Sequence, residues 1–279
     1  MEYLMTYGWA ILIIAIVLVA LFSLGVFNSA NFAPKAPPGS CQVFRPDGPG
    51  TTFDLNLEGE CNGELPQYAA YFNGQSSGVS IIDANMLDFT GGILTVSTWI
   101  YWGGGGNANY LVDKYSNKYS LELSPNGPTQ PIGRFLAAGS GYAQGAASLS
   151  PNVWYYFVGT YSQGNALFYV DGQQIGSSTG GSSISSGGNL EIGCYASCSS
   201  SYSFNGLIAN VQIYNTSLGA SSVQALYNEG IGGVPIDITN LVGWWPLNGN
   251  ANDYSGNQNN GAATSVIYTT SWTNGYTTP

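Results

Sequence analysis

Short segments in which apolar and polar residues alternate dominate the chain from about residue 51 onward. GILTVSTWIYW is the clearest of them, since Leu94 and Ile100 fall on one face of an extended strand and Trp99 on the other. The segments TTFDLNL, NVWYYFVGTYS, NALFYVDGQQIG, NLEIGCY and GLIANVQIYN also read as strands. Turn residues between them, with the hairpin signal Asp171-Gly172, predict many short antiparallel strands. We therefore expect a mainly β fold, an antiparallel two-sheet sandwich.

One segment departs from this pattern. SSVQALYNEG, from Ser221 to Gly230, combines a serine cap, a terminal glycine, and the apolar residues Val223 and Leu226 at helical spacing. These features predict a short surface helix.

The composition excludes several classes of function. Charged side chains make up only 7% of the chain, far below the roughly 25% that is usual for soluble domains. Lysine and arginine total five, so the chain lacks the basic surface that nucleic-acid binding needs. There is no histidine, which excludes a Ser-His-Asp triad and histidine-based acid–base chemistry. A hydroxyl-rich surface with little charge suits an extracellular protein, and it equally suits a β protein with many turns.

Four cysteines favour disulfides in an oxidising, extracytoplasmic setting. Without histidine and without a Cys-x2-Cys pair, a structural zinc site is not indicated. Three pairings are open, and Cys41–Cys61 with Cys194–Cys198 is the most economical because both bridges are local.

The apolar run WAILIIAIVLVALFSLGVF, from Trp9 to Phe27, lies near the N-terminus. As a helix it would span about 28 Å, close to the thickness of a bilayer core. No Lys or Arg precedes it, which disfavours a cleaved secretory signal. A single-span anchor fits its length, whereas Glu2 at the helix start favours a helical bundle, in which the acid finds a partner.

The residues MEYLMTYGWAILIIAIVLVALF resemble the N-terminal segment of archaeal type IV pilin-like proteins. The resemblance implies a class III signal peptide cut before the helix, an apolar helix that builds a filament core, and a match of Glu2 to the family's glutamate. The family's basic cleavage region is missing upstream, so the chain is near its processed form or its true start lies earlier. The implied assembly residues are Glu2, Trp9, Ile13, Ile16, Leu21 and Phe27.

A second resemblance runs from about residue 68 to residue 233. YAAYFNGQSSGVSI, LTVSTWIYW, NVWYYFVGTYSQGNALFYVDGQQIGSS, LEIG and FNGLIANVQIYNTSLGASSVQALYNEGIGG, in this order, resemble the laminin-G-like, concanavalin A-like jelly-roll family. The resemblance implies two packed antiparallel sheets. It implies carbohydrate or protein binding more often than catalysis, although enzymes share the fold.

The acidic residues are scattered along the sequence, with Asp113 in LVDKY, Glu122 in SLELSP and Glu191 in NLEIG. A glycosidase needs two carboxylates that flank one bond, and the Glu-x-Asp-x-(x)-Glu signature of jelly-roll glucanases is absent. We therefore expect no enzymatic activity.

Calcium is the one cofactor that the sequence indicates, because members of the family often hold an ion near the sheet rim and calcium takes hard oxygen ligands. The candidate ligands are Asp253 in NGNANDYSG and Asn210 in LIANVQ, where relatives often carry an acid. The asparagine weakens the case, and turn-forming asparagines explain the loop equally well. Asn215, in the sequon NTS, is a candidate glycosylation site.

The segment WWPLNGNANDYSGNQNNG, from Trp244 to Gly261, begins like a core strand but lies near the end of the chain. In jelly-roll relatives such a segment usually comes first. Three explanations are open: the stump of a second repeat, a permuted strand that completes the chain's own domain, or a strand donated to another subunit. Completion within the chain by Trp244 and Trp245 is favoured, because the linker over residues 230–240 is short.

The predicted organisation is a pilin-like helix at residues 1–30, a Pro-rich linker at 31–50, and a jelly-roll head at 51–279 whose segment 241–279 is the permuted or donated strand. The leading hypothesis is a structural subunit of an extracellular, cell-surface archaeal filament of the type IV pilus kind. Its partners would be further copies of the chain and, during biogenesis, the membrane. The alternative is a membrane-anchored, lectin-like adhesin that binds surface glycans.

Overall fold

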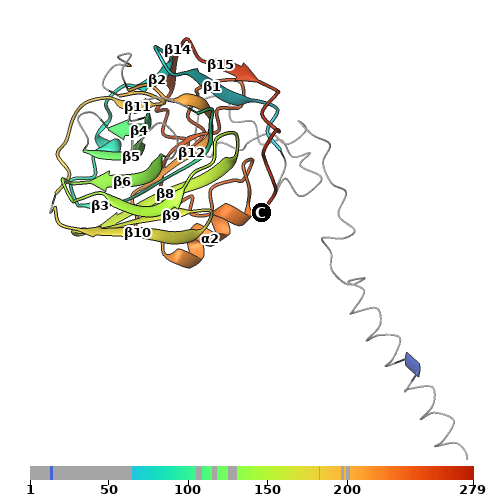
Figure 1. Ribbon diagram of the computed structural model, residues 1–279. Coiled ribbons are helices and arrows are strands. Elements are labelled where there is room, and N and C mark those ends of the chain that lie inside the picture. Colours follow the sequence, from blue (N-terminus) through green and yellow to red (C-terminus); the bar gives the residue numbers. More distant parts are fainter. Residues whose placement is uncertain are drawn as a thin grey trace, which may run out of the picture.

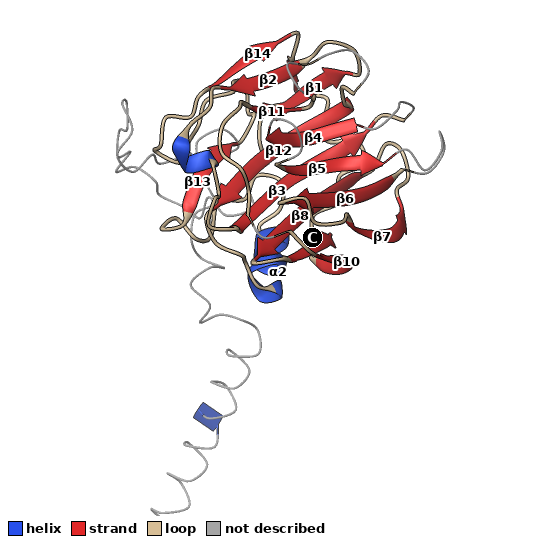
Figure 2. Cartoon of the chain, turned by 90° about the vertical axis from the view of Figure 1, so that its left-hand side faces the viewer, coloured by secondary structure: helices blue, strands red, loops and turns tan. Residues whose placement is uncertain are grey.

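The computed structural model describes residues 13–14, 65–104, 109–114, 118–124, 131–181, 183–195, 198 and 202–279. Two antiparallel sheets face each other in a sandwich (Figures 1 and 2). The first sheet has the order β10 (Gln173–Thr179), β9 (Asn165–Val170), β8 (Trp154–Ser162), β3 (Ile93–Trp102), β12 (Asn205–Tyr214), β1 (Ala69–Asn73) and β15 (Ile267–Thr269), and β13 (Leu241–Trp245) also pairs with β12. The second sheet has the order β14 (Gly261–Thr264), β2 (Gly78–Ile81), β11 (Leu190–Ile192), β4 (Asn109–Lys114), β5 (Tyr119–Ser124), β6 (Ile132–Ala137) and β7 (Ala143–Ser148).

Strand β3 shows how the alternating pattern produces two buried faces. Leu94 and Ile100 belong to the apolar layer between the sheets, and Trp99 belongs to a second cluster on the opposite face of the first sheet. The expected mainly β, two-sheet sandwich is confirmed.

The predicted hairpin and helix are also present. Asp171 and Gly172 join β9 to β10 with φ values of +49° and +77°, as a primed hairpin turn requires. The helix α2 (Ala220–Asn228) lies where it was expected, and a short 3-10 helix, η2 (Asn85–Leu87), precedes β3. The predicted serine cap is wrong, because Gly219 occupies the N-cap position and provides no side-chain hydrogen bond.

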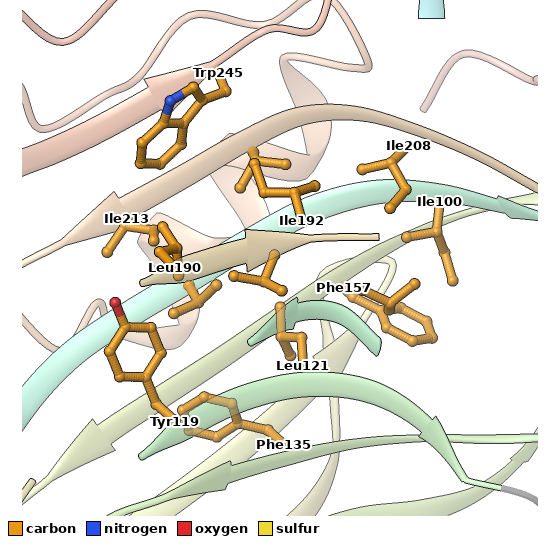
Figure 3. Packing of buried hydrophobic residues seen from close by; sticks show 14 of the residues in the cluster. Ile100, Tyr119, Leu121, Phe135, Phe157, Leu190, Ile192, Ile208, Ile213 and Trp245 are labelled. Atoms are coloured by element: carbon orange, nitrogen blue, oxygen red, sulfur yellow. The ribbon is translucent and has the colours of Figure 1, made fainter. Parts of the chain in front are cut away.

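Phenyl rings and glycines interlock between the two sheets. A Cβ atom on Gly133 of β6 would lie 2.6 Å from the ring of Phe157 on β8, and a Cβ atom on Gly159 of β8 would lie 2.1 Å from the ring of Phe135 on β6. Both glycines therefore let a ring from the facing sheet pack directly on the backbone. Figure 3 shows Phe135 and Phe157 in the same layer as Leu190 and Trp245.

The outer face of the first sheet is covered by a second apolar layer. Val223 and Leu226 of α2 pack here, and the C-terminal tail adds Trp272, whose ring is 6.1 Å from that of Trp154. Figure 1 shows α2 beside β9 and β10, with the C-terminus close to the helix. The central strands of this sheet, such as β3 and β12, are therefore buried on both faces.

Strand β13 lies in the chain's own first sheet. Trp244 and Trp245 pair with Gln212 and Val211 of β12. Trp245 is fully buried between the sheets, and its Nε1–H donates to the carbonyl of Asn259 at 2.9 Å. The tryptophan pair thus places one ring on each face of the sheet.

The loop after β13 is organised around the buried carboxylate of Asp253. Its Oδ1 accepts the backbone N–H groups of Trp244 at 3.0 Å and Ser255 at 2.8 Å, and its Oδ2 accepts that of Asn259 at 2.9 Å. The Asn259 side chain in turn donates to the carbonyl of Val242 at 3.1 Å. These bonds tie the loop to β13 and orient the Trp245 ring.

Most predictions for the N-terminal part of the chain concern residues outside those that the structure describes. These predictions are the pilin-like helix at residues 1–30, the Pro-rich linker at 31–50 and the strand TTFDLNL. Within the helix, only Ile13 and Ile14 are described, and both are helical. Within the part of the chain that the structure describes, no helix is both long enough and apolar enough to cross a membrane.

We expect Asp253→Asn to lower the free energy of unfolding by about 1–3 kcal/mol, because one buried N–H group loses its acceptor. Urea denaturation of the full-length chain checks this. Asn252→Ala, at an exposed neighbouring position, is the control and should change the stability by less than about 0.5 kcal/mol. Equal losses in the two variants would contradict the role assigned to Asp253.

Candidate functional site

Three acids that are far apart in the sequence come together on the outer face of the second sheet. Glu191 of β11 is the direct cross-strand partner of Asp113 on β4, and Glu122 lies on the next strand, β5. Their neighbours along the strands, such as Leu121 and Ile192, point into the core, so the acids face the other way. All three acids are buried. Carboxylates directly opposite each other destabilise a sheet, and such local violations are expected at functional sites.

A polar row crosses this face from β4 to β7. In the strand register Tyr110 lies opposite Glu122, Glu122 opposite Arg134, and Arg134 opposite Gln144. The Nε atom of Arg134 is 3.1 Å from Oε1 of Glu122, and its guanidinium carbon lies 3.8 Å above the centre of the Tyr142 ring. The row therefore combines an ion pair with a cation–π contact.

Burial raises the pKa of the Glu122 carboxyl above its ordinary value of 4.5. The positive charge of Arg134 acts in the opposite direction, as do hydrogen bonds from Arg134, Tyr110 and Ser120. Desolvation is the larger effect, because it penalises the ionised form more than these neighbours stabilise it.

Three tyrosines cluster at the β4 end of this row. The Tyr195 ring lies 4.7 Å from that of Tyr110 and 5.8 Å from that of Tyr202, and the rings of Tyr110 and Tyr202 are 6.1 Å apart. Tyr110 is buried, Tyr195 is half-buried, and Tyr202 is 42% exposed. The cluster forms an aromatic surface that extends from the buried Tyr110 on the sheet to the exposed Tyr202.

The predicted Cys194–Cys198 disulfide is present beside this cluster. A Cβ atom at Gly78 of β2 would lie 2.1 and 2.3 Å from the two sulfurs, so only glycine lets the bridge rest on β2. The Glu191 Oε1 atom accepts the Ser80 hydroxyl at 3.0 Å, and its Oε2 lies 3.9 Å from each sulfur. The carboxylate and the two sulfurs lie within 4.8 Å of one another, but bonded sulfurs are not available as metal ligands.

A second charged cluster lies on other strands and loops, and its groups are satisfied within the fold. The buried Lys114 ammonium is 2.6 Å from Oδ1 of Asp83 and 3.1 Å from Oδ1 of Asp88. Asp88 also accepts the backbone N–H of Gly187 at 2.9 Å. These bonds join two loops to β4, and we assign the cluster a structural role.

The two calcium candidates are engaged in hydrogen bonds within the protein. Both carboxylate oxygens of Asp253 accept backbone N–H groups, whose positive ends would repel a cation. The Asn210 Oδ1 atom accepts the Gln212 side-chain amide at 2.9 Å and the Trp244 indole N–H at 2.8 Å. Both residues thus help to hold the C-terminal strand in place, and calcium binding at Asp253 and Asn210 stays a prediction.

The other predicted site residues are placed as follows. Asn215 is exposed just after β12, so its glycosylation stays a prediction. Glu2, Trp9, Ile16, Leu21 and Phe27, together with Cys41 and Cys61, lie outside the described residues, and Ile13 is described only as part of a helical turn.

Asp113, Glu122 and Glu191 are scattered along the sequence, and only the folded chain brings them together. The available signal was local: Glu122 and Glu191 each stand between two apolar residues of a strand, which places each acid on the face away from the core. What the sequence did not reveal is that β11, β4 and β5 are neighbours.

The fold and this face together define a jelly-roll protein with one polar, aromatic sheet surface. Residues 73–224 match the concanavalin A-like lectin/glucanases superfamily, and the chain belongs to this family. The predicted jelly-roll resemblance is thus confirmed. The family description includes lectins and glucanases, so membership alone does not separate binding from catalysis.

Two solved structures share the fold. A candidate carbohydrate-binding protein from Bacteroides ovatus is 16% identical with a TM-score of 0.59, and the match covers 73% of this chain and 60% of that one. The heptameric SAP-like pentraxin from Limulus polyphemus is 15% identical with a TM-score of 0.54, over 73% of this chain and 94% of that one. This chain therefore spans less than two thirds of the Bacteroides protein. No curated protein matches the chain.

We expect Gly78→Ala to lower the free energy of unfolding by about 1–3 kcal/mol, because the added methyl group overlaps both sulfurs of the disulfide. Gly91→Ala is the matched control, since a Cβ atom there meets nothing within 4 Å. Denaturant unfolding of both variants checks this, and a stability loss in Gly91→Ala as large as that in Gly78→Ala would refute the close-contact explanation.

The raised pKa of Glu122 predicts the direction in which the stability of the protein changes with pH. Just above pH 4.5 the folded state holds more protons on this carboxyl than the unfolded state does, so its contribution to stability falls as the pH rises. The free energy of unfolding of the wild type, relative to Glu122→Gln, should therefore decrease with rising pH across this window. Urea titrations at a series of pH values measure the difference, and a flat or rising difference would be inconsistent with the raised pKa.

Proposed function

We propose that this chain is a lectin-like protein that binds carbohydrate on the outer face of its second sheet. The observation that carries the proposal is the cluster of Tyr110, Tyr195 and Tyr202 beside the Glu122–Arg134 ion pair. Aromatic rings offer a flat apolar surface to the C–H face of a sugar ring, and a few oriented polar groups add specificity. The membership of the lectin/glucanase family supports this assignment.

The charge of this face favours neutral sugars. Among the described residues, this face carries three acids, Asp113, Glu122 and Glu191, and one guanidinium, that of Arg134, which lies opposite Glu122. The whole chain also carries a formal net charge of −10. Sulfated sugars and uronic acids would meet repulsion here, whereas neutral sugars would not.

We infer binding without catalysis. Glycoside hydrolysis needs two carboxylates that flank the bond to be broken. Glu122 is ion-paired with Arg134, and the Glu191 carboxylate lies between the Ser80 hydroxyl and the disulfide. Both acids are thus engaged inside the protein.

We place the protein outside the cytoplasm, because a disulfide such as Cys194–Cys198 persists in oxidising compartments. Assembly of a filament through residues 1–30 stays a prediction of the sequence. It is compatible with the binding function, since a filament subunit can carry a carbohydrate-binding head.

Tyr202→Ala should weaken glycan binding about tenfold, because one aromatic contact contributes about 1.4 kcal/mol. Tyr71→Ala is the matched control, since Tyr71 is 36% exposed and lies on the other sheet. The full-length chain is first applied to an array of neutral, sulfated and uronic glycans, and the variants are compared on the neutral glycan that binds best.

Binding of neutral glycans that is lost in Tyr202→Ala and kept in Tyr71→Ala supports the proposal. Absence of binding to every glycan, or equal losses in the two variants, would contradict it. Preferential binding of sulfated glycans would contradict the assignment of the ligand class.

A further inference from the structure

The geometry points to a second role for the Cys194–Cys198 disulfide: it positions the tyrosine cluster for its ligand, so that binding at this face depends on the oxidised bridge. This inference rests on the proposed function, because the cluster is the proposed contact surface for the sugar.

Tyr195 connects the bridge to the cluster. It follows Cys194 directly in the chain, and its ring contacts both other rings of the cluster, those of Tyr110 and Tyr202. The bridge closes a turn in which the Cys198 N–H donates to the Tyr195 carbonyl at 3.0 Å. The covalent bond between Cys194 and Cys198 therefore restrains the backbone that carries the Tyr195 ring.

The packing of the bridge on β2 restricts where separated sulfurs can move. Gly78 lies directly against both sulfur atoms. Sulfurs that are no longer bonded must move apart to a van der Waals separation of about 3.5 Å or more. Because β2 blocks one side, the turn has to move away from the sheet, and Tyr195 moves with it.

Glu191 adds a second reason for the turn to rearrange. Reduction breaks the S–S bond with two electrons from the reductant, and two protons complete the two thiols. Each thiol then carries a hydrogen that it can donate to Oε2 of Glu191, which lies 3.9 Å from both sulfurs. One buried carboxylate thus attracts both thiols, and the reduced turn has several conformations in place of one.

The rest of the sandwich does not depend on the bridge. Gly193, just before the turn, donates its N–H to the Leu111 carbonyl at 2.9 Å and accepts the Phe204 N–H at 2.8 Å. Strand β11 itself pairs with β2 on one side and β4 on the other. Loss of the bridge should therefore release the turn and Tyr195 and leave both sheets folded.

The test compares two double variants of the full-length chain. Cys194→Ser/Cys198→Ser removes this bridge, and the matched control Cys41→Ser/Cys61→Ser leaves it intact. The probes are neutral oligosaccharides derived from cellulose, mannan and chitin, and binding is measured by calorimetry. Because a flexible ring must be ordered when the sugar binds, we expect about tenfold weaker binding for the first variant and unchanged binding for the control. Circular dichroism reports whether the sandwich stays folded.

Each outcome has a distinct meaning. If the oxidised wild type binds none of the probes, the proposed function fails. If the wild type binds and Cys194→Ser/Cys198→Ser binds equally well, the positioning role alone is overturned. If that variant unfolds, the Cys41→Ser/Cys61→Ser variant, in which Cys194–Cys198 is the bridge that remains, is reduced with a phosphine. EDTA is present so that a metal does not bind the two free thiols. Weakened binding that returns on reoxidation then supports the inference, and unchanged binding or unfolding overturns it.

Discussion

Strand β12 imposes the constraint on which the rest of the structure depends. It is ten residues long and almost wholly buried, so its backbone groups need partners along the whole strand. One edge pairs with β3, and the other is divided between β1, at residues 205–208, and β13, at residues 211–214. At the junction Asn210 adopts a φ of +53°, and its N–H donates to the Pro246 carbonyl at 3.1 Å. Two segments from opposite ends of the head therefore meet on one edge, because neither is long enough to satisfy β12 alone.

This arrangement gives the two sheets different roles. The C-terminal segment that supplies β13 continues into the tail, which covers the outer face of the first sheet together with α2. The Trp99 ring there is 5.7 Å from that of Tyr227 on α2 and 5.6 Å from that of Tyr276 in the tail. Burial of aromatic area stabilises that face and removes it from the solvent. The outer face of the second sheet carries the buried acids, the arginine and the tyrosines that form the candidate site, and Tyr202 extends this site to the solvent.

Some features of the site could be predicted from the sequence and others could not. The local bridge between Cys194 and Cys198 was predicted from its spacing, because such a pair needs no knowledge of the fold. The backbone contacts of Asp253 could not be predicted, because a carboxylate in an asparagine-rich loop looks the same in sequence whether it binds a cation or accepts backbone N–H groups. The difference depends on which N–H groups surround it, and the Trp244 N–H belongs to a neighbouring strand. The tyrosine cluster was hidden for a similar reason, since Tyr110 is far from Tyr195 and Tyr202 in the sequence.

The sequence by itself determined the period-two strands, the hairpin at Asp171-Gly172 and the helix near Ser221. All of these follow from interactions between residues close in the chain, whose side chains alternate or stack with a fixed period. Only the tertiary structure decided that Glu122 and Glu191 share one face, and that Trp244 and Trp245 enter the sheet of their own chain. Strand order depends on backbone pairing and packing between distant segments. The local pattern of one strand does not indicate which other strand will pair with it.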